Sequence, residues 1–413
     1  MDLVNWAGNV RFRAERIATP ASVDDVCAIL SGPGPFRALG SGHSFSLIAD
    51  TDGTLISTAG LAAAPVVDAQ SRTVTVGAGI RYGELARALE AEGWALANLA
   101  SLPHISVAGA VATGTHGSGD AVGTLSSAVA ALELVVPGGD VVRLRRGDPA
   151  FDAAVVSLGA LGVVTSITLD IEPSFEVRQR VYENLPLETA LADFDALMGA
   201  AYSVSLFLRW GDRDVVDQVW TKSRSAEPPV LPGDPAPAAG PVHMLAGVSP
   251  AACTPQLGEP GRWLDRLAHF RLSHTPSAGA ELQSEHLVPR RHAVAAIRAV
   301  RELADRIAPL IQVTEIRSMR ADSLWLSPAY ETDAVGLHFT WLPDQPAVEA
   351  VVAEIEAALA PFQARPHWGK LSAMDAAGRA AVWPRLREFA ALTREFDPEG
   401  RLRNPYLSFL DEL

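Results

Sequence analysis

The 413-residue chain has little cysteine, no excess of basic residues and no long apolar run. Its two cysteines, Cys27 and Cys253, lie far apart and outside any CxxC pair, which argues against a disulfide framework and against a metal site. The formal net charge is −14, whereas a nucleic-acid binder needs a basic face. No segment approaches the roughly 20 apolar residues that span a bilayer. We therefore expect no metal, and neither nucleic acid nor a membrane as a partner.

The N-terminal residues 1–6 lack the basic start and apolar run of a signal peptide. Together with two thiols that have no disulfide pattern, this predicts a cytoplasmic protein. Hydrophobic residues make up 48% and charged residues 20%, as in a soluble globular protein. The length is sufficient for two domains, each with its own core.

Helix and strand patterns alternate along the chain, which predicts an α+β fold with mixed sheets in two domains. Ser22 and Asp25 are typical of a capped helix start. The proline-rich residues 227–250 predict an extended surface loop or lid. The expected helices are 23–30, 82–92, 151–158, 290–308 and 348–360, and the expected strands are 65–68, 72–76, 132–136, 141–144, 163–171, 203–208, 310–316 and 335–342.

One glycine pattern, Gly77, Gly79 and Gly83 between a strand and a helix, imitates a dinucleotide-binding fingerprint. That fingerprint places an acidic residue about 20 positions further on, to hold the ribose. Residues 95–103 contain no acid and no strand-like run. The pattern therefore does not predict NAD binding.

A second glycine pattern, residues 40–44, reads Gly-Ser-Gly-His-Ser. Glycines let backbone N–H groups approach an anion closely, so this loop suits a pyrophosphate. His43 on such a loop is placed either to contact the cofactor or merely to close the turn.

Residues 101–119 form a third segment of small, hydroxyl-bearing and glycine residues. It has too few large apolar residues for a core and too little proline, lysine or glutamate for a linker. A backbone that lies against a flat cofactor has this composition. Two glycine-rich segments with histidines in one domain therefore favour a cofactor site.

These segments, with Gly-Ala-Leu-Gly-Val-Val-Thr at 159–165, resemble the FAD-binding domain of the vanillyl-alcohol-oxidase superfamily. Residues 366–370 and 396–401 resemble its branch of aldonolactone and alditol oxidases, and the match to alditol oxidases extends over the chain, including residues 5–9, 201–207 and 279–285. The resemblance implies a two-domain fold with a vanillyl-alcohol-oxidase-type FAD-binding domain at 1–175. It further implies an α+β substrate-binding domain with a large antiparallel sheet at 176–360, and a C-terminal segment at 361–413 that returns to the FAD domain.

The resemblance also implies FAD attached covalently through the ring of His43 to the flavin 8α-methyl group. Members with a second link use a cysteine in the region of Ser101, and none is present there, so a single link is implied. The implied cofactor-binding residues are Leu39, Gly40, Ser41, Gly42, Ser44, Phe45, Ser101, Ser106, Gly109, Thr113, Gly114, Thr115, His116, Val163 or Val164, and His367.

Two expected strands carry polar pairs that alternate with apolar residues. Period-2 alternation places Glu315 and Arg317 on one face of their strand, and His338 and Thr340 on one face of theirs. Surface charge pairs on a half-exposed sheet produce the same pattern. The resemblance implies instead that both pairs belong to a substrate pocket, whose members are Ser101, Glu315, Arg317, Thr340 and Lys370.

The residue types fit the oxidation of a primary alcohol. Burial and the like charge of Arg317 are expected to lower the pKa of Lys370, so that it acts as a base or stabilises an alkoxide. Arg317 would hold developing negative charge, and His338 would orient Lys370 or a hydroxyl group. Glu315, Thr340 and Ser101 would bind the remaining hydroxyls of a polyol.

The leading hypothesis is an alditol oxidase, which converts the terminal CH2OH of xylitol or sorbitol to the aldose and O2 to hydrogen peroxide. An aldonolactone oxidase or dehydrogenase and a flavin-binding protein without turnover are the alternatives. Ala100 is expected to border the edge of the flavin where oxygen arrives, and the protein is expected to be a monomer.

Overall fold

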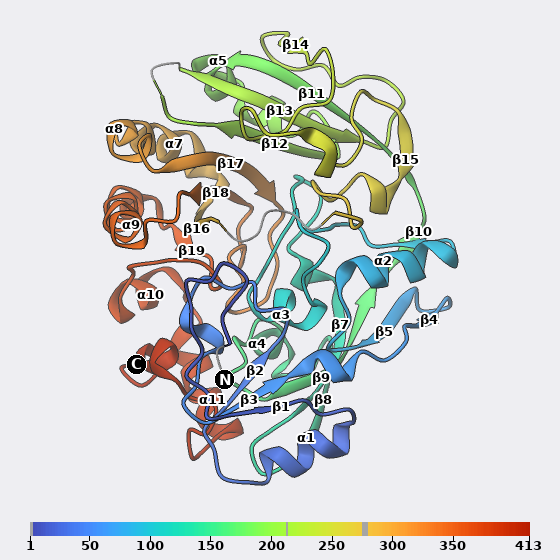
Figure 1. The fold of residues 1–413 in the computed structure, drawn as a ribbon, viewed down its shortest axis with the longest axis vertical. Helices are drawn as coiled ribbons and strands as arrows, with labels where there is room; N and C mark the ends of the chain where they lie inside the picture. Colours follow the sequence, from blue (N-terminus) through green and yellow to red (C-terminus); the bar gives the residue numbers. More distant parts are fainter. Residues whose placement is uncertain (1–2, 212–213, 275–279) are drawn as a thin grey trace.

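The computed structural model describes residues 3–211, 214–274 and 280–413. The first two residues of the N-terminal segment and Gly279 of the matched segment 279–285 lie outside the described residues. The described strands form a three-stranded, a five-stranded and a nine-stranded sheet and a two-stranded pair. We call the first three the small, the middle and the large sheet. In Figure 1 the small and middle sheets lie in the lower half of the molecule and the large sheet in the upper half.

The small sheet is parallel, in the order β1 (Arg16–Ala18), β3 (Thr54–Ser57), β2 (Phe36–Leu39). Helix α1 (Val23–Leu30) precedes β2 and begins at the predicted capping box, in which Ser22 and Asp25 each bond the other's backbone N–H. Val26 and Leu30 of this helix pack with Phe36 of β2 in one apolar cluster. The glycine loop 40–44 begins directly after β2, which ends at Leu39.

The middle sheet is antiparallel and contains two hairpins made of predicted strands, β4 (Val66–Asp68) with β5 (Thr73–Gly77) and β7 (Val129–Val135) with β8 (Val141–Arg145). Strand β9 (Val163–Asp170) lies between β5 and β7, and its residues alternate between buried and half-buried. Helices α2 (Tyr82–Ala91), α3 (Val107–Ala112) and α4 (Phe151–Val155) contribute to the same core. A two-stranded pair of β6 (Trp94–Ala95) and β10 (Glu172–Pro173) completes this half.

The glycines that imitate a dinucleotide fingerprint have a packing role. A Cβ on Gly77 would lie 1.9 Å from the carbonyl oxygen of Leu61, and one on Gly79 would lie 2.1 Å from that of Thr58. Only glycine allows this close approach of two backbones. None of the three fingerprint glycines lines the cavity described below.

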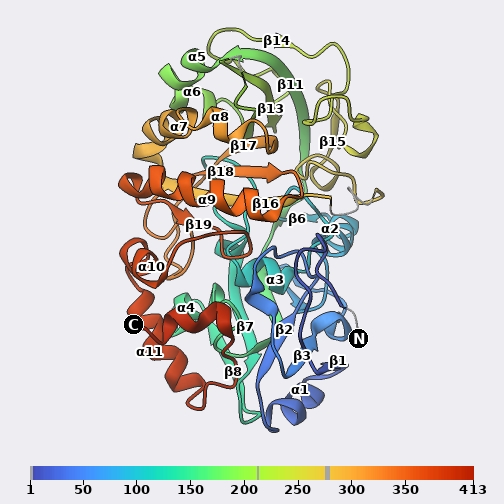
Figure 2. The same cartoon turned by 60° about the vertical axis from the view of Figure 1, so that its left-hand side comes forward.

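The large sheet is antiparallel throughout. Its strands, in spatial order, are β14 (Ala236–Pro237), β11 (Glu176–Pro186), β13 (Val215–Ser223), β12 (Ser203–Leu208), β17 (Ile311–Met319), β18 (Ala334–Trp341), β16 (Leu282–Pro289) and β19 (Arg365–Pro366), with β15 (Pro260–Arg262) paired to β11. One face packs against α5 (Leu187–Ala192), α6 (Phe194–Met198), α7 (Ala293–Arg301), α8 (Ala304–Ile307) and α9 (Gln345–Leu359). Figure 2 shows α7, α8 and α9 along this outer face. The opposite face of the sheet is therefore available to the other half of the molecule.

Two helix predictions were wrong in extent. The helix expected over 290–308 is a 3-10 turn at Arg290–His292 followed by α7 and α8, with a break at Leu303, whose φ of −96° and ψ of 12° leave the helical region. The helix expected over 151–158 ends at Val155, because Leu158 adopts a left-handed φ of 56° before Gly159. Neither break carries a proline, so the periodicity alone could not reveal it.

The proline-rich residues 227–250 are a loop for most of their length, as predicted, but not a free one. Ala236–Pro237 forms β14 on the edge of β11, while Leu231 and Met244 are buried. The segment is thus partly packed against the large sheet.

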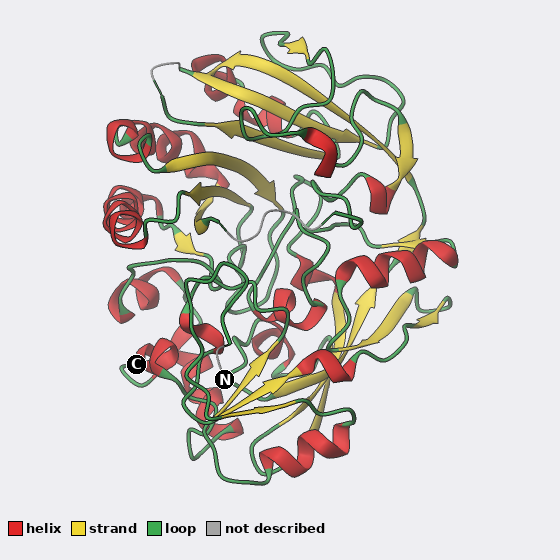
Figure 3. Cartoon of the chain, in the orientation of Figure 1, coloured by secondary structure: helices red, strands yellow, loops and turns green. Residues whose placement is uncertain are grey.

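The C-terminal helices α10 (Ala376–Val382) and α11 (Leu386–Phe396) lie beside the lower half of the molecule (Figures 1 and 3). Trp383, Leu386 and Phe389 belong to the same apolar cluster as Val76 of the middle sheet. The mixture of helices and strands in Figure 3 agrees with the predicted α+β class. The domain boundaries at residues 175 and 360 stay predictions.

Candidate active site

A cavity of about 530 Å3 lies between the two halves of the molecule. The glycine loop after β2, the segment 100–116 and the loop 157–164 line one side of the cavity. Strands β16, β17 and β18 of the large sheet line the other side, and residues 243–252 and 269–270 complete the wall. The cavity therefore joins the two glycine-rich segments to the strands with polar pairs.

Reciprocal hydrogen bonds join the glycine loop 40–44 to the segment 101–119. The Ser41 N–H donates to Oγ of Ser106 at 3.2 Å, and the Ser106 N–H donates to Oγ of Ser41 at 3.1 Å. A Cβ on Gly40 would lie 2.3 Å from the Ser106 Oγ, and Gly42 has a φ of +69°. Glycine is required at both positions, one for close approach and one for backbone conformation.

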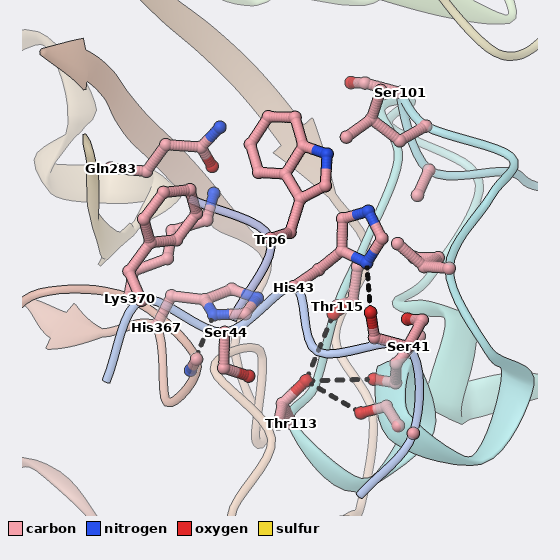
Figure 4. A pocket seen from close by; sticks show the side chains of 18 of the residues that line it. Trp6, Ser41, His43, Ser44, Ser101, Thr113, Thr115, Gln283, His367 and Lys370 are labelled. Atoms are coloured by element: carbon pink, nitrogen blue, oxygen red, sulfur yellow. Dashed lines mark hydrogen bonds between the residues drawn. The ribbon is translucent and has the colours of Figure 1, made fainter. Parts of the chain in front are cut away.

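The N-terminal segment holds the loop from its other side. The Trp6 N–H donates to the Gly42 carbonyl at 2.8 Å, and the Asn5 side-chain amide donates to the Ser44 carbonyl at 2.9 Å. The Trp6 indole stacks on the His43 imidazole with centroids 5.4 Å apart and an angle of 18° between the planes. Figure 4 shows both rings at the cavity.

His43 is held as a neutral imidazole. Its Nδ1 lies 3.1 Å from the carbonyl oxygen of Ser41, and burial lowers its pKa to about 4. A neutral ring retains a lone pair, which is what nucleophilic attack on an electrophilic carbon requires.

Most of the residues predicted to bind the cofactor line the cavity. They are Leu39, Gly40, Ser41, Gly42, His43, Ser44, Phe45, Ser101, Ser106, Gly109, Thr113, Thr115, His116, Val164 and His367. Gly114 and Val163 are not among the lining residues. Val163 is fully buried in the apolar cluster under α1, and the following residue, Val164, faces the cavity instead because successive strand residues point to opposite faces.

Arg37, which also lines the cavity, was missed by the sequence analysis. Its guanidinium is 2% exposed and donates to the carbonyl oxygens of Ile48, Leu158, Gly159 and Leu402. No carboxylate pairs with it among the described residues, and burial lowers its pKa to about 10. Backbone carbonyls thus use all five donors of the guanidinium, so Arg37 would favour an anionic group such as a pyrophosphate through its positive charge and not through a hydrogen bond. The residues on this side of the cavity therefore fit FAD.

The polar end of the cavity is built by the register of four neighbouring strands. Phe207, Glu315, His338 and Glu285 are cross-strand partners in one row over β12, β17, β18 and β16. The row on one side contains Val313, Thr340 and Gln283, and the row on the other contains Ser205, Arg317 and Gly336. The predicted alternation of β17 and β18 is confirmed, because Ile316 packs in the opposite apolar core. The surface interpretation is wrong, because both strands are almost wholly buried.

Glu285 is the centre of this site and was not predicted. Its Oε2 lies 2.6 Å from Nζ of Lys370, and its Oε1 lies 3.1 Å from both a terminal nitrogen of Arg317 and Nε2 of His116. Burial alone would raise the pKa of the Glu285 carboxyl, but Lys370, His116 and Arg317 hold that pKa well below its usual range. Glu285 is thus a buried carboxylate that neutralises the two cations of the site.

The absence of a side chain at Gly336 provides space for the Glu285 carboxylate. A Cβ on this residue would lie 3.0 Å from Oε1 of Glu285 and 3.5 Å from Cε1 of His116. Because Gly336 is also the cross-strand partner of Arg317, the missing side chain lets the guanidinium and the carboxylate meet over β18.

Glu315 is the second buried carboxylate. His269 Nε2 lies 2.7 Å from its Oε1, Arg317 Nε lies 3.6 Å from the same oxygen, and His338 Nδ1 lies 3.8 Å from its Oε2. Burial would raise the pKa of Glu315, but Arg317 and His269 hold it well below its usual range. Nε of Arg317 has no hydrogen-bond partner among the described residues, so one donor remains available at this place.

Lys370 lies in the turn after β19, two residues beyond Trp368, which stacks on Trp383. Its pKa is lowered mainly by burial, which Glu285 opposes and Arg317 reinforces. The predicted direction of this pKa is therefore confirmed. Figure 4 shows Lys370 beside His367 and Gln283.

The remaining predicted residues lie around this centre. Ser101 accepts a hydrogen bond from Arg317 at 3.4 Å, and Thr340 lines the cavity. His338 Nε2 lies 3.1 Å from the amide oxygen of Gln283, and its Nδ1 lies 3.8 Å from Oε2 of Glu315, while its predicted role in orienting Lys370 stays a prediction. Ala100 lines the cavity next to Ser101.

At the polar end of the cavity, the sequence analysis missed Gln283, Glu285 and His269. The first two lie in the segment 279–285 that carried the family resemblance, and they alternate on β16 as the polar pairs do on β17 and β18. That alternation was the available signal. His269 lies in a segment without secondary-structure pattern, and only the fold brings it to Glu315.

Comparison with known proteins defines the class of this protein. Residues 14–145 match the family described as FAD binding domain, and residues 280–410 match the family described as D-arabinono-1,4-lactone oxidase. The fold is similar to that of the cholesterol oxidase from B. sterolicum, with a TM-score of 0.79 at 17% identity over 99% of this chain and 96% of that chain. The protein is an oxidoreductase of the FAD-binding type with a vanillyl-alcohol-oxidase fold.

Sequence relatives define the family. The chain is 47% identical to an alditol oxidase from Streptomyces sp. (strain IKD472 / FERM P-14339) over 98% of each sequence. It is 28% identical to an L-gulono-1,4-lactone dehydrogenase from Mycobacterium tuberculosis (strain ATCC 25618 / H37Rv) over 97% of each, and 26% identical to an L-gulonolactone oxidase from Mus musculus over 98% of this chain and 96% of the relative. The chain belongs to the alditol oxidase family of the vanillyl-alcohol-oxidase superfamily, so the predicted resemblance is confirmed.

Two further features are absent from the described residues. None of the described helices combines the length and the apolar composition needed to cross a membrane. The described histidine, cysteine, aspartate and glutamate side chains form no cluster of three that could hold a metal ion.

Proposed function

We propose that this protein is an FAD-dependent alditol oxidase, which converts the terminal CH2OH of a small alditol such as xylitol or sorbitol to the aldose and O2 to hydrogen peroxide. The observation that carries the proposal is the buried array of Glu285, Glu315, Arg317 and Lys370 at one end of the cavity. Such charges are costly to bury, and a polyol offers the hydroxyl groups that complement them.

The side chains divide into two groups by what they do to the substrate. Lys370 and Arg317 act at the hydroxyl group being oxidised: burial lowers the pKa of Lys370, which either acts as the base or, as an ammonium group paired with Glu285, stabilises an alkoxide, and Arg317 stabilises negative charge on the oxygen. Glu315, Thr340 and Ser101 bind the other hydroxyls, with His338 and Gln283 beside them. The chemistry that bound FAD would supply is acceptance of the hydride from the carbon atom and transfer of the electrons to O2.

The first experiment is peroxide release by the purified protein in aerated buffer, with xylitol and L-gulono-1,4-lactone compared side by side. We expect peroxide from xylitol and little from the lactone. Peroxide from the lactone alone would instead assign the protein to the aldonolactone oxidases. Bleaching of the bound flavin by xylitol in the absence of air, without peroxide in its presence, would indicate that another acceptor replaces O2.

We further propose that FAD is attached covalently, by a single bond from the ring of His43 to the 8α-methyl group. The neutral state of the ring, its place in the cavity and the stacking of Trp6 against it support this proposal. Acid precipitation is expected to leave the yellow flavin with the parent protein and to release it from His43→Ala. His104→Ala is the control, because His104 is absent from the cavity lining. Flavin in the supernatant of the parent protein would contradict the link.

We also propose that the protein acts as a monomer in the cytoplasm. Light scattering after size exclusion is expected to give the mass of one chain, and fractionation of the source cells tests the location.

A further inference from the structure

Only two of the 34 lysine and arginine residues of the chain are lysines, Lys222 and Lys370. Lys370 belongs to the site described above. Lys222 lies on β13, two strands away from β17, and is 1% exposed. No carboxylate lies within ion-pair distance of its ammonium group among the described residues. Burying a lysine without a counter-ion costs folding free energy. We therefore expect Lys222 to have a function that an arginine could not perform.

The contacts of Lys222 identify that role. Its Nζ donates to the carbonyl oxygen of Leu267 at 2.5 Å and to that of Ala268 at 3.1 Å, and it lies 3.2 Å from Nδ1 of His269. An ammonium group has three donors and no acceptor. Nδ1 of His269 must therefore accept the third hydrogen bond, which places the proton of the neutral ring on Nε2. This is the nitrogen that lies 2.7 Å from Oε1 of Glu315.

Neighbouring aromatic rings hold the imidazole of His269 in one orientation. It packs edge-on against Phe207 and Trp220, with centroid distances of 5.6 and 5.3 Å. Burial lowers the pKa of His269 to about 4, so the ring is neutral at ordinary pH and has one N–H to donate. If that proton moved to Nδ1, the lone pair of Nε2 would face the Glu315 carboxylate.

We propose that Lys222 is a positioning residue for the substrate site: it fixes the tautomer of His269, which then donates to Oε1 of Glu315 and leaves Oε2 for a hydroxyl group of the polyol. This inference rests on the proposed alditol oxidase function. Lys222 itself is not among the residues that line the cavity, and acts only through His269 and Glu315.

The test is a double-mutant cycle with Lys222→Met and His269→Gln, measured as kcat and KM for xylitol. Glutamine can donate an N–H to Glu315 and has no tautomer to be set. Burial lowers the pKa of Lys222 to about 7, against the opposing charge of Glu315, while Cys253, Arg317 and Arg266 are the other charged or titratable groups near it. The assays are therefore made at about pH 6, where the ammonium form prevails.

In the parent background, Lys222→Met is expected to raise KM about tenfold or more and to change kcat little. Without Lys222 the hydrogen bond from His269 to the Glu315 carboxylate is lost, and this carboxylate also binds the substrate. His269→Gln changes the site itself, so its own KM is the reference for the second background, and adding Lys222→Met to it is expected to change that KM by less than about threefold. A purely structural role of Lys222 predicts the same loss in both backgrounds, and that result, or an unchanged KM in the single variant, would overturn the proposal.

A second measurement does not depend on the folding of Lys222→Met or on turnover. In the parent protein labelled with 15N-histidine, the signal that His269→Gln removes is expected to report a proton on Nε2 at about pH 6. A proton on Nδ1 would overturn the inference. Failure of the parent protein to oxidise xylitol would contradict the proposed function, but the tautomer measurement would still test the contacts of Lys222.

Discussion

At the scale of single residues, the site depends on one carboxylate that touches three polar partners. Glu285→Gln keeps the size of the side chain but removes the charge that neutralises Lys370 and Arg317. Because this substitution leaves the buried cations of Lys370 and Arg317 without a counter-charge, we expect the free energy of unfolding to fall by about 3 kcal/mol. We also expect kcat/KM for the alditol to fall. Urea unfolding and steady-state kinetics measure both.

The matched control is Glu188→Gln, which breaks the exposed ion pair between Glu188 and Arg298. Exposed pairs contribute little, so the change is expected to stay below about 0.5–1 kcal/mol. Equal losses of stability in the two variants would contradict the central role of Glu285.

Ala100 tests oxygen access at the same scale. It is 6% exposed, precedes Ser101 and lines the cavity. Ala100→Leu adds three carbon atoms there, and we expect slower reoxidation of the reduced flavin in stopped-flow experiments. The rate of anaerobic reduction by xylitol is the internal control. Reoxidation as fast as in the parent would show that oxygen arrives elsewhere.

At the scale of elements, the site is a property of strand register. Glu315, His338 and Glu285 meet because β17, β18 and β16 are aligned, and a slip by one residue would turn all three to the apolar core. Gly336 of β18 has no side chain, and the Glu285 carboxylate occupies the space beside it. Gly336→Ala places a methyl group 3.0 Å from Oε1 of Glu285, so the carboxylate must move by a few tenths of an ångström.

We expect Gly336→Ala to fold but to lose about tenfold in kcat/KM, because small displacements of positioned groups are costly to catalysis. Gly240→Ala is the control, since a Cβ at Gly240 has no neighbour within 4 Å. Parent-like kinetics with an unchanged thermal midpoint would show that the contact is accommodated at no cost.

At the scale of the whole molecule, buried ionisable groups make stability depend on pH. Burial lowers the pKa of His269, of His286 and of His338 to about 4 in the folded state. In the unfolded state these rings take up protons below about pH 6.5, so protons favour the unfolded chain from there downward. Glu285 and Glu315 add a further loss once the pH falls below the unfolded value of about 4.3.

We therefore expect the free energy of unfolding to decrease already between about pH 6.5 and pH 5, before carboxylates titrate. His286→Leu should make this part of the curve less steep, because neither ring nitrogen of His286 has a hydrogen-bond partner among the described residues. His292→Leu is the comparison variant, since His292 is only half-buried and lies just before α7. A flat curve down to pH 5 would contradict the prediction.

The sequence was most informative where local rules determine structure. The capped helix at 23–30, the strands at 65–68, 72–76, 132–136 and 141–144, and the alternation of Glu315 and Arg317 were predicted from turn residues, caps and periodicity. The break at Leu303 was not, because it has no proline or glycine to mark it. Family resemblance, rather than periodicity, selected the pocket over a surface charge pair.

By itself, the sequence determined the class of protein, because glycines at fixed positions are needed wherever a backbone must approach a cofactor or another backbone. Only the tertiary structure decided which charges meet. Lys222, His269, Glu285 and Lys370 are far apart in the chain, and strand register together with the packing of an irregular segment brings them to Glu315 and Arg317. The physical reason is that the interaction between two charges depends on their separation in space, and no local sequence pattern encodes that separation.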